Sequence, residues 1–165
     1  MRAGARPKVN SGSGPQLEFA LIEHNSARYR DLVALRRRVL RTPLGLDFTP
    51  EHLEEERADI HIAAYLQGKL VACVILAMDD RSRDARVKLR QMAVDPDHQG
   101  LGIGKRLLVF AERLAKDGGY REIVAHARET AVRFYEGAGY VATGEPFTEV
   151  TIPHRKMVKH LAAPR

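Results

Sequence analysis

Apolar and polar residues follow one another along this chain in patterns typical of both strands and helices. Period-two alternation, or a short apolar run between turn residues, predicts strands over 16–22, 59–66, 70–78, 86–94, 120–127 and 155–160. Helical spacing of apolar residues, bounded by capping residues or glycines, predicts helices over 25–40, 50–57, 104–116 and 129–137. We expect a charged turn over 79–85, and a loop or wide hairpin connection over 144–153, which contains a glycine and prolines.

The fourth predicted strand changes its alternation before it ends. Val87 and Leu89 are apolar at odd positions, whereas Met92 and Val94 are apolar at even positions. Side chains of a strand alternate between faces with a period of two, so this change of parity indicates one inserted residue. We therefore predict a β-bulge at 90–91, which would leave backbone N–H and C=O groups unpaired.

Glycines connect this strand to the third predicted helix, whose first N–H groups have no partner within the helix and favour phosphate. A dinucleotide fingerprint would need glycine where Lys105 stands. A Walker A loop would need glycine in place of Gln99, and Ser or Thr in place of Arg106. The remaining pattern is Gln99-x-x-Gly102-x-Gly104, followed by two cationic side chains.

A second motif lies at the end of the fourth predicted helix. Phe134 and Tyr135 are followed, after three residues, by Gly139 and Tyr140. The two motifs, in this order and on these elements, resemble the signatures of the GCN5-related N-acetyltransferases (GNAT). Three residues before Ala131, where that family often carries Asn, this chain has Arg128.

The GNAT resemblance implies a fold, a cosubstrate and a set of contacts. It implies an α/β (α+β) GNAT fold: a central mixed, mostly antiparallel sheet of six to seven strands, with a bulged, splayed strand and about four helices on both faces. The cosubstrate would be acetyl-CoA. The implied cofactor-binding residues are Met92, Ala93, Val94, Gln99, Gly100, Leu101, Gly102, Ile103, Gly104, Lys105, Arg128, Phe134 and Tyr135.

Acetyl transfer to an amine needs an acid for the leaving thiol and a base for the amine. A phenol can protonate sulfur, and we assign this role to Tyr135. Glu149, His154 and His126 are the candidates for the base, although a histidine in the place of His126 is more often structural. The loop residues implied to line the acceptor site are Leu44, Leu46, Asp47 and Phe48.

A shorter match lies near the C-terminus. Phe147-x-Glu149, followed by Ile152-Pro153-His154, is similar to a bacterial branch of small acetyltransferases called ElaA-like. It would place two of the base candidates in that branch's pattern.

Composition sets bounds on these expectations. At 165 residues we expect a single domain over 16–162, after an N-terminal tail over 1–15. The net charge of +6 favours anionic ligands. We expect the arginines at 36–38 on a solvated face, and the single cysteine, Cys73, in an inert packing position with no disulfide and no metal site. No signal peptide and no apolar run of ~20 residues is visible, so we expect a cytoplasmic protein without a membrane partner.

The leading interpretation is therefore an acetyl-CoA-dependent N-acetyltransferase that acts on a small-molecule or peptide amine. The alternative is a non-catalytic, CoA-binding regulatory module of the same fold. We do not expect nucleic-acid binding, because basic strands with interleaved aromatic residues and a helix-turn-helix pattern are both missing. The sequence does not identify the acceptor amine, and it does not decide between a monomer and a homodimer.

Overall fold

The computed structural model describes residues 16–78 and 85–161. These residues form two compact units. The first unit holds the described residues up to Ile75 together with Gln91–Phe110, and the second holds the others. The tail predicted over 1–15 and most of the turn predicted over 79–85 lie outside the described residues.

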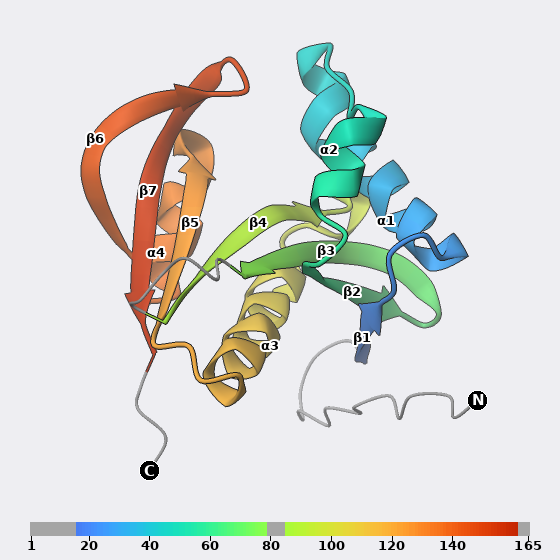
Figure 1. The fold of residues 1–165 in the computed structure, drawn as a ribbon, viewed down its shortest axis with the longest axis horizontal. Helices are drawn as coiled ribbons and strands as arrows, with labels where there is room; N and C mark the ends of the chain where they lie inside the picture. The colour runs from blue at the N-terminus through green and yellow to red at the C-terminus, as the bar shows by residue number, and fades with distance from the viewer. Residues whose placement is uncertain (1–15, 79–84, 162–165) are drawn as a thin grey trace. The chain divides into compact units, whose positions relative to one another are not determined.

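The strands are β1 Leu17–Ile22, β2 Ile60–Leu66, β3 Lys69–Met78, β4 Arg86–Val94, β5 Glu122–Arg128, β6 Val141–Glu149 and β7 Ile152–His160. The α-helices are α1 Ala27–Arg36, α2 Pro50–Glu55, α3 Ile103–Asp117 and α4 Val132–Gly137 (Figure 1). The strands form one sheet in the order β1-β2-β3-β4-β5-β7-β6. β4 and β5 are parallel, as the βαβ unit requires, and β1–β2, β5–β7 and β6–β7 are antiparallel. The prediction of a mixed, mostly antiparallel sheet is confirmed.

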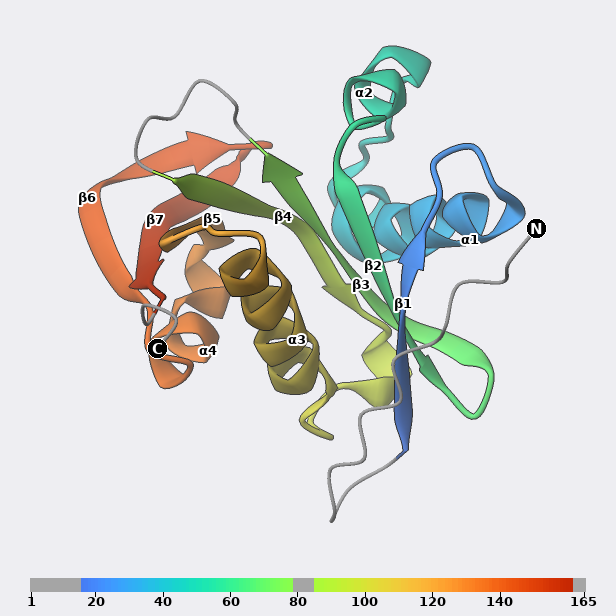
Figure 2. The same cartoon turned by 60° about the horizontal axis from the view of Figure 1, so that its bottom comes forward.

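The core of the first unit lies where α1 packs beside β1 and β2 (Figure 2). The Ser26 side chain accepts a hydrogen bond from the N–H of Tyr29 and so begins α1. Thr49 caps α2 in the same way, in a capping box with His52. The buried residues of this core are Ile22, Tyr29, Leu32, Val33, Leu35, Ala63, Cys73 and Ala93.

The prediction that the arginines at 36–38 share a solvated face is wrong for Arg36, which is 1% exposed. Its guanidinium donates two hydrogen bonds to the carboxylate of Glu56, at 2.6 and 3.0 Å, and stacks 4.7 Å from the ring centre of Phe48. Tyr29 donates a further hydrogen bond of 2.5 Å to the same carboxylate. A buried charge in this position is tolerated because the carboxylate of Glu56 pairs with it through two hydrogen bonds.

The second unit has helices on one face of the β5–β7–β6 sheet. The ammonium of Lys159, in β7, donates to the carbonyl of Ala138 at the end of α4 and to the carboxylate of Glu112 in α3. Lys159 pairs with Ile123 of β5, so the side chains at every second position from this pair point toward the helices. The side chains between them point to the opposite face.

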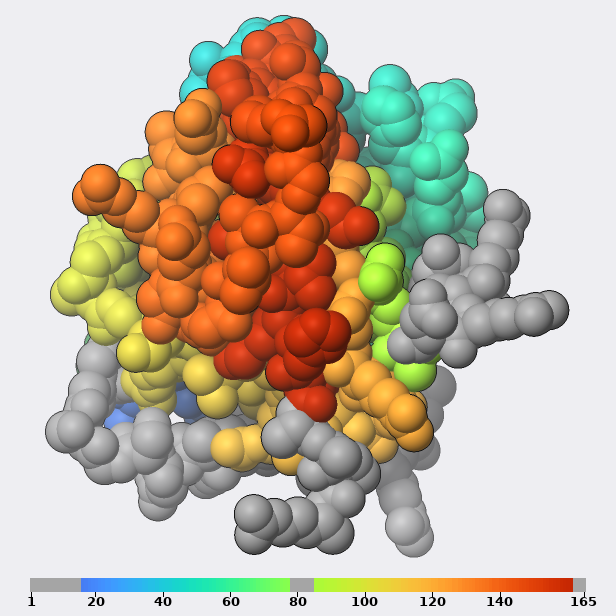
Figure 3. Space-filling model, turned by 90° about the vertical axis from the view of Figure 1, so that its left-hand side faces the viewer, coloured from blue at the N-terminus to red at the C-terminus, as the bar shows by residue number. Residues whose placement is uncertain are grey.

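The loop predicted over 144–153 is mostly strand, and this prediction is wrong. β6 continues to Glu149, β7 begins at Ile152, and only two residues with positive φ form the turn between them. The pairing register shifts between Thr143 and Phe147, so the glycine and proline of this stretch fit into an irregular strand. Pro153 pairs with β6 beyond the last pair between β5 and β7. Figure 3 shows β6 and β7, in orange and red, at the surface of this unit.

Candidate active site

The strand that leads into the glycine loop departs from regular geometry at the predicted bulge. Gln91 has a φ of 55°, although it lies inside β4, and such a conformation is uncommon for a residue other than glycine. Two residues later, Ala93 is buried in the core of the first unit. The N–H of Asp95 then donates to the carbonyl of Val71 in β3, which fixes the end of the strand.

The loop itself is shaped by two glycines in the left-handed region. Gly100 and Gly102 both have a φ of 79°, and a Cβ added at either would meet nothing within 4 Å. The backbone therefore needs glycine for its conformation, and the space outside it is open to a ligand. The side-chain amide of Gln99 donates to the carbonyl of Val94 at 3.2 Å and ties the loop to its strand.

α3 begins directly after Gly102, whose carbonyl accepts the first helical hydrogen bond, from Arg106. Ile103 is 1% exposed and anchors the helix start, while Lys105 is exposed beside it. The N–H groups of 103–105 precede the first intrahelical donor, and the helix dipole adds positive potential there. This geometry fits a diphosphate, and the residues that would hold it are those predicted from Gln99 to Lys105.

A cleft of about 520 Å³ opens beside the start of this loop within the first unit. Its polar walls include Arg38 and Asp95, which form an ion pair of 2.9 Å. The N–H of Asp97 donates to Asp95, and this bond together with the charge of Arg38 holds the pKa of the Asp95 carboxyl below its usual range. The Asp95 carboxylate in this wall is therefore already paired.

The loop predicted to line the acceptor site lies between α1 and α2, in the first unit. Asp47 accepts hydrogen bonds from the guanidinium of Arg37 and from the N–H of Phe48. The Phe48 ring lies between the guanidiniums of Arg36 and Arg41, each 4.7 Å from its centre. Leu44 ends a short 3-10 turn, and Leu46 is exposed near it. The proposed acceptor role of these residues remains a prediction.

The second motif forms α4 in the second unit. Tyr135 is 6% exposed, and its ring lies edge-on to those of Phe134 and Tyr140, at 5.1 and 5.3 Å. Burial raises the pKa of the Tyr135 phenol, so the phenol keeps its proton at neutral pH, as a general acid must. Arg128 ends β5 and is half-buried, and burial lowers the pKa of its guanidinium.

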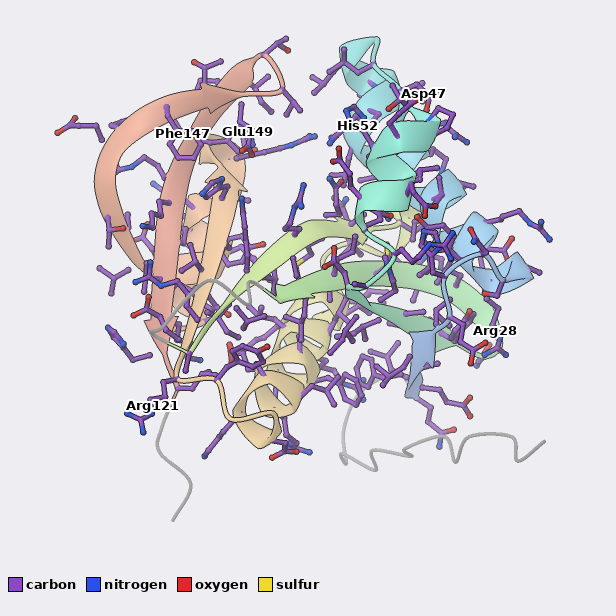
Figure 4. The ribbon with its side chains drawn as sticks, viewed as in Figure 1. Arg28, Asp47, His52, Arg121, Phe147 and Glu149 are labelled. Carbon is purple, nitrogen blue, oxygen red and sulfur yellow. The ribbon has the colours of Figure 1, made fainter. Side chains whose placement is uncertain are left out.

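All three base candidates meet at one end of the second unit. Nδ1 of His126 lies 3.1 Å from Oε1 of Glu149, and Nε2 of His154 lies 3.8 Å from Oε2 of the same carboxylate. The ring of Phe147 lies between the two imidazoles, 4.9 Å from His126 and 5.9 Å from His154. Figure 4 shows Phe147 and Glu149 together at this end of β6, with Arg121 at the opposite end of the unit.

The pKa of Glu149 reflects this environment. Burial by itself would raise the pKa, but the hydrogen bond from His126 and the electrostatic effects of the neighbouring His126, Lys88 and His154 outweigh it and lower the pKa. Lys88 is half-buried in β4, and burial lowers the pKa of its ammonium. Lys88 is not among the site residues that the sequence predicts. Its only signal was a cationic residue between two apolar ones in a predicted strand.

The structure thus groups the predicted residues within each unit. Those from Met92 to Lys105 follow one another along the first unit, and Arg128, Phe134, Tyr135, Glu149 and His154 lie in the second. No group of three His, Cys, Asp or Glu side chains that could hold a metal ion occurs among the residues the structure describes. In the same ranges no helix is both long and apolar enough to cross a membrane.

A glycine loop at the start of a helix, a βαβ unit and a mixed sheet define an α/β protein whose loop is suited to a phosphate-bearing ligand. The family described as the acetyltransferase (GNAT) domain matches residues 46–161. The chain is 30% identical over 141 residues to the uncharacterized N-acetyltransferase YjcF of Bacillus subtilis (strain 168), covering 85% of this chain and 98% of that protein. The chain belongs to the GNAT family.

Other relatives agree with this assignment. N-acetyltransferase 8B of Homo sapiens is 33% identical over 116 residues, which cover 67% of this chain and 50% of that protein. The structure of Escherichia coli ElaA superposes with a TM-score of 0.74 at 19% identity, covering 87% of this chain and 99% of that one. An aminoglycoside 6'-N-acetyltransferase complexed with coenzyme A gives a TM-score of 0.72 at 19% identity, covering 89% and 98%. At these identities the two structures show a shared fold, and the ElaA-like branch remains a prediction.

Proposed function

We propose that this protein transfers an acetyl group from acetyl-CoA to a primary amine by direct attack of the amine on the thioester. The observation that carries the proposal is the pair of glycines at a φ of 79° directly before the exposed first turn of α3. Membership of the GNAT family supports the same activity. When bound, acetyl-CoA supplies the activated acyl group, and the protein binds, orients and moves protons.

In this proposal the cofactor contacts are divided between the elements that the structure describes. Backbone N–H groups of 103–105 bind the diphosphate, with Lys105 adding charge. Met92, Ala93 and Val94, in the first unit, contact the pantetheine arm. The cofactor contacts of Arg128 and Phe134, in the second unit, remain predictions from the family resemblance. Tyr135 protonates the leaving thiolate, and Glu149 or His154 serves the amine as base. The cytoplasmic location is a prediction from the sequence. The sequence leaves the choice between a monomer and a homodimer open.

The loop assignment is tested by titrating the protein with acetyl-CoA in a calorimeter. Gly102→Glu would place a carboxylate in the open space outside the loop, and we expect it to weaken binding at least tenfold, about 1.4 kcal/mol. Gly68→Glu is the matched control, because Gly68 also has a positive φ, of 81°, and open surroundings, but lies in the turn between β2 and β3. Equal affinities for the two variants would contradict the loop assignment.

The transferase activity is tested with a panel of primary amines, with free thiol as the readout. The panel includes an amino sugar, an aminoglycoside, a peptide with a free N-terminus and a lysine peptide. We expect amine-dependent thiol release with at least one of them. Saturable acetyl-CoA binding without thiol release from any amine would favour the non-catalytic alternative.

A further inference from the structure

The face of β5, β7 and β6 opposite α4 carries a group of titratable side chains. Lys159 and Ile123 point toward α4 and α3, because the ammonium of Lys159 bonds to Ala138 and Glu112. His126 is three residues after Ile123, so its side chain lies on the other face. The register then places Lys156, His154 and Phe147 on that same face. Glu149 reaches His126 across β7 there.

The proton positions in this group follow from the hydrogen-bond partners. A backbone carbonyl can only accept, so Nδ1 of His154, 2.8 Å from the carbonyl of Ile152, carries its proton. An ionised carboxylate also only accepts. The lowered pKa keeps Glu149 ionised at neutral pH, so Nδ1 of His126 carries a proton and donates it. In its neutral form His126 therefore presents an unprotonated Nε2.

Accessibility and basicity distinguish the three candidates. The side chain of His154 is 4% exposed and its Nε2 already faces Glu149, so an amine cannot approach it. Glu149 has its pKa lowered and is occupied by His126, which makes it a weak base. The side chain of His126 is 28% exposed and has one nitrogen free to accept a proton. A base oriented through its second nitrogen by a carboxylate is also the arrangement that activates nucleophiles in other enzymes.

We propose that His126 is the general base of the acetyl transfer and that Glu149 is its positioning residue. This inference rests on the proposed N-acetyltransferase function and replaces Glu149 and His154 as the base. The new C–N bond forms as the thioester C–S bond breaks. The amine proton passes to Nε2 of His126, and the leaving thiolate takes the proton of Tyr135. His126 then becomes an imidazolium whose charge is balanced by Glu149. The imidazolium releases its proton to solvent, and solvent returns a proton to the Tyr135 phenolate.

The surroundings of His126 support a neutral amine as the attacking species. Lys156 of β7 pairs directly with His126, and Arg128 lies two residues further along β5 on the same face. Lys88 pairs with Val124, two residues before His126, and so shares that face. With Glu149 as the facing carboxylate, these cations disfavour an ammonium group and favour loss of its proton. α4, with Tyr135, lies on the opposite face of β5, so acid and base would reach the thioester from two sides.

The geometry is tested by NMR of the imidazole nitrogens, which needs no acceptor. In the wild-type protein at neutral pH we expect His126 to carry its proton on Nδ1. Glu149→Ala should release that preference, while the signal of His154 should stay on Nδ1. A wild-type His126 protonated on Nε2 would overturn the proposal, whatever the activity of the protein.

The chemistry is tested with the best amine of the panel above. His126→Ala should lower kcat at least 100-fold and leave the affinity for acetyl-CoA within about twofold. Added imidazole should restore activity at least tenfold, which loss of a merely structural histidine would not allow. Glu149→Gln should lower kcat about tenfold or more, without loss of acetyl-CoA affinity.

The matched control is His160→Ala. His160 is also paired with a glutamate, since its Nδ1 lies 3.2 Å from Glu122, but its side chain is 82% exposed at the far end of β7. We expect this variant to retain wild-type kcat. Wild-type turnover in His126→Ala, or a loss that imidazole leaves unchanged, would overturn the base assignment alone. A wild-type protein that releases no thiol with any amine would overturn the proposed function itself.

Discussion

Glu56→Gln tests the claim that a buried ion pair holds the first unit together. The substitution keeps the volume of the side chain and removes its charge. Arg36, which is 1% exposed, would then be left as a buried cation without its carboxylate, and the amide NH2 of Gln could not accept the hydrogen bond that the second carboxylate oxygen accepts from Arg36. Breaking a buried pair of this kind typically costs about 3–5 kcal/mol.

For a chain of this length the cost corresponds to a decrease of about 6–20 °C in the unfolding midpoint, measured by calorimetry or circular dichroism at pH 7. Glu54→Gln is the matched control. Glu54 also accepts a 2.6 Å bond from an arginine, Arg57, but the two side chains are 61% and 55% exposed. We expect Glu54→Gln to have the same unfolding midpoint as the wild-type protein.

The effect of Glu56→Gln should also depend on pH. The carboxyl of Glu56 has its pKa lowered from 4.5: burial opposes ionisation, but the bonds and charge of Arg36 prevail. Its contribution is therefore complete above about pH 4.5 and is lost as the pH falls through the folded-state pKa. Equal unfolding midpoints for Glu56→Gln and Glu54→Gln at pH 7 would refute the argument, as would a difference that grows toward pH 3.

Three further predictions concern single residues. Tyr135→Phe should slow thiol release at least tenfold with unchanged acetyl-CoA affinity, and unchanged turnover would remove Tyr135 from the acid role. Burial lowers the pKa of His61 from 6.5, so the wild-type protein should lose stability as the pH falls below 6.5, and His61→Gln should flatten that part of the stability profile. Cys73 is 1% exposed, and burial raises the pKa of its thiol to about 12. A thiol reagent should therefore label it only after denaturation, and rapid labelling of the native protein would contradict its burial.

Local patterns were sufficient to predict most of the fold. Period-two alternation predicts β1. Capping residues predict the starts of α1 and α2, where the structure has Ser26 and Thr49, because a cap is defined by neighbouring residues. The glycine loop was predicted for a similar reason. Two positive φ values and the start of α3 lie within a few residues of one another. Each of these features depends on short-range geometry, which sequence spacing records.

The errors concern features that depend on distant partners. Arg36 is buried because Glu56, 20 residues later, returns to it, and nothing in the arginine triplet indicates which of its members has such a partner. Glycine and proline normally interrupt strands, so the sequence predicts a loop where the structure has most of β6. Its pairing with β7 tolerates them through a register shift that becomes visible only when both strands are in place.

That register shift also explains why the base could not be chosen from the sequence. An uninterrupted ladder from the Thr143–Lys156 pair would set Phe147 opposite Ile152 and would leave Glu149 in the turn. The observed pairing sets Phe147 opposite His154, and Glu149 then reaches His126, 23 residues away, on a strand with which β6 does not pair. Between these two pairs β6 has two residues more than β7, and this difference sets the position of Glu149. The two additional residues bring the carboxylate to the imidazole, and their deletion should disrupt the pair while leaving every side chain of the proposed chemistry in the sequence.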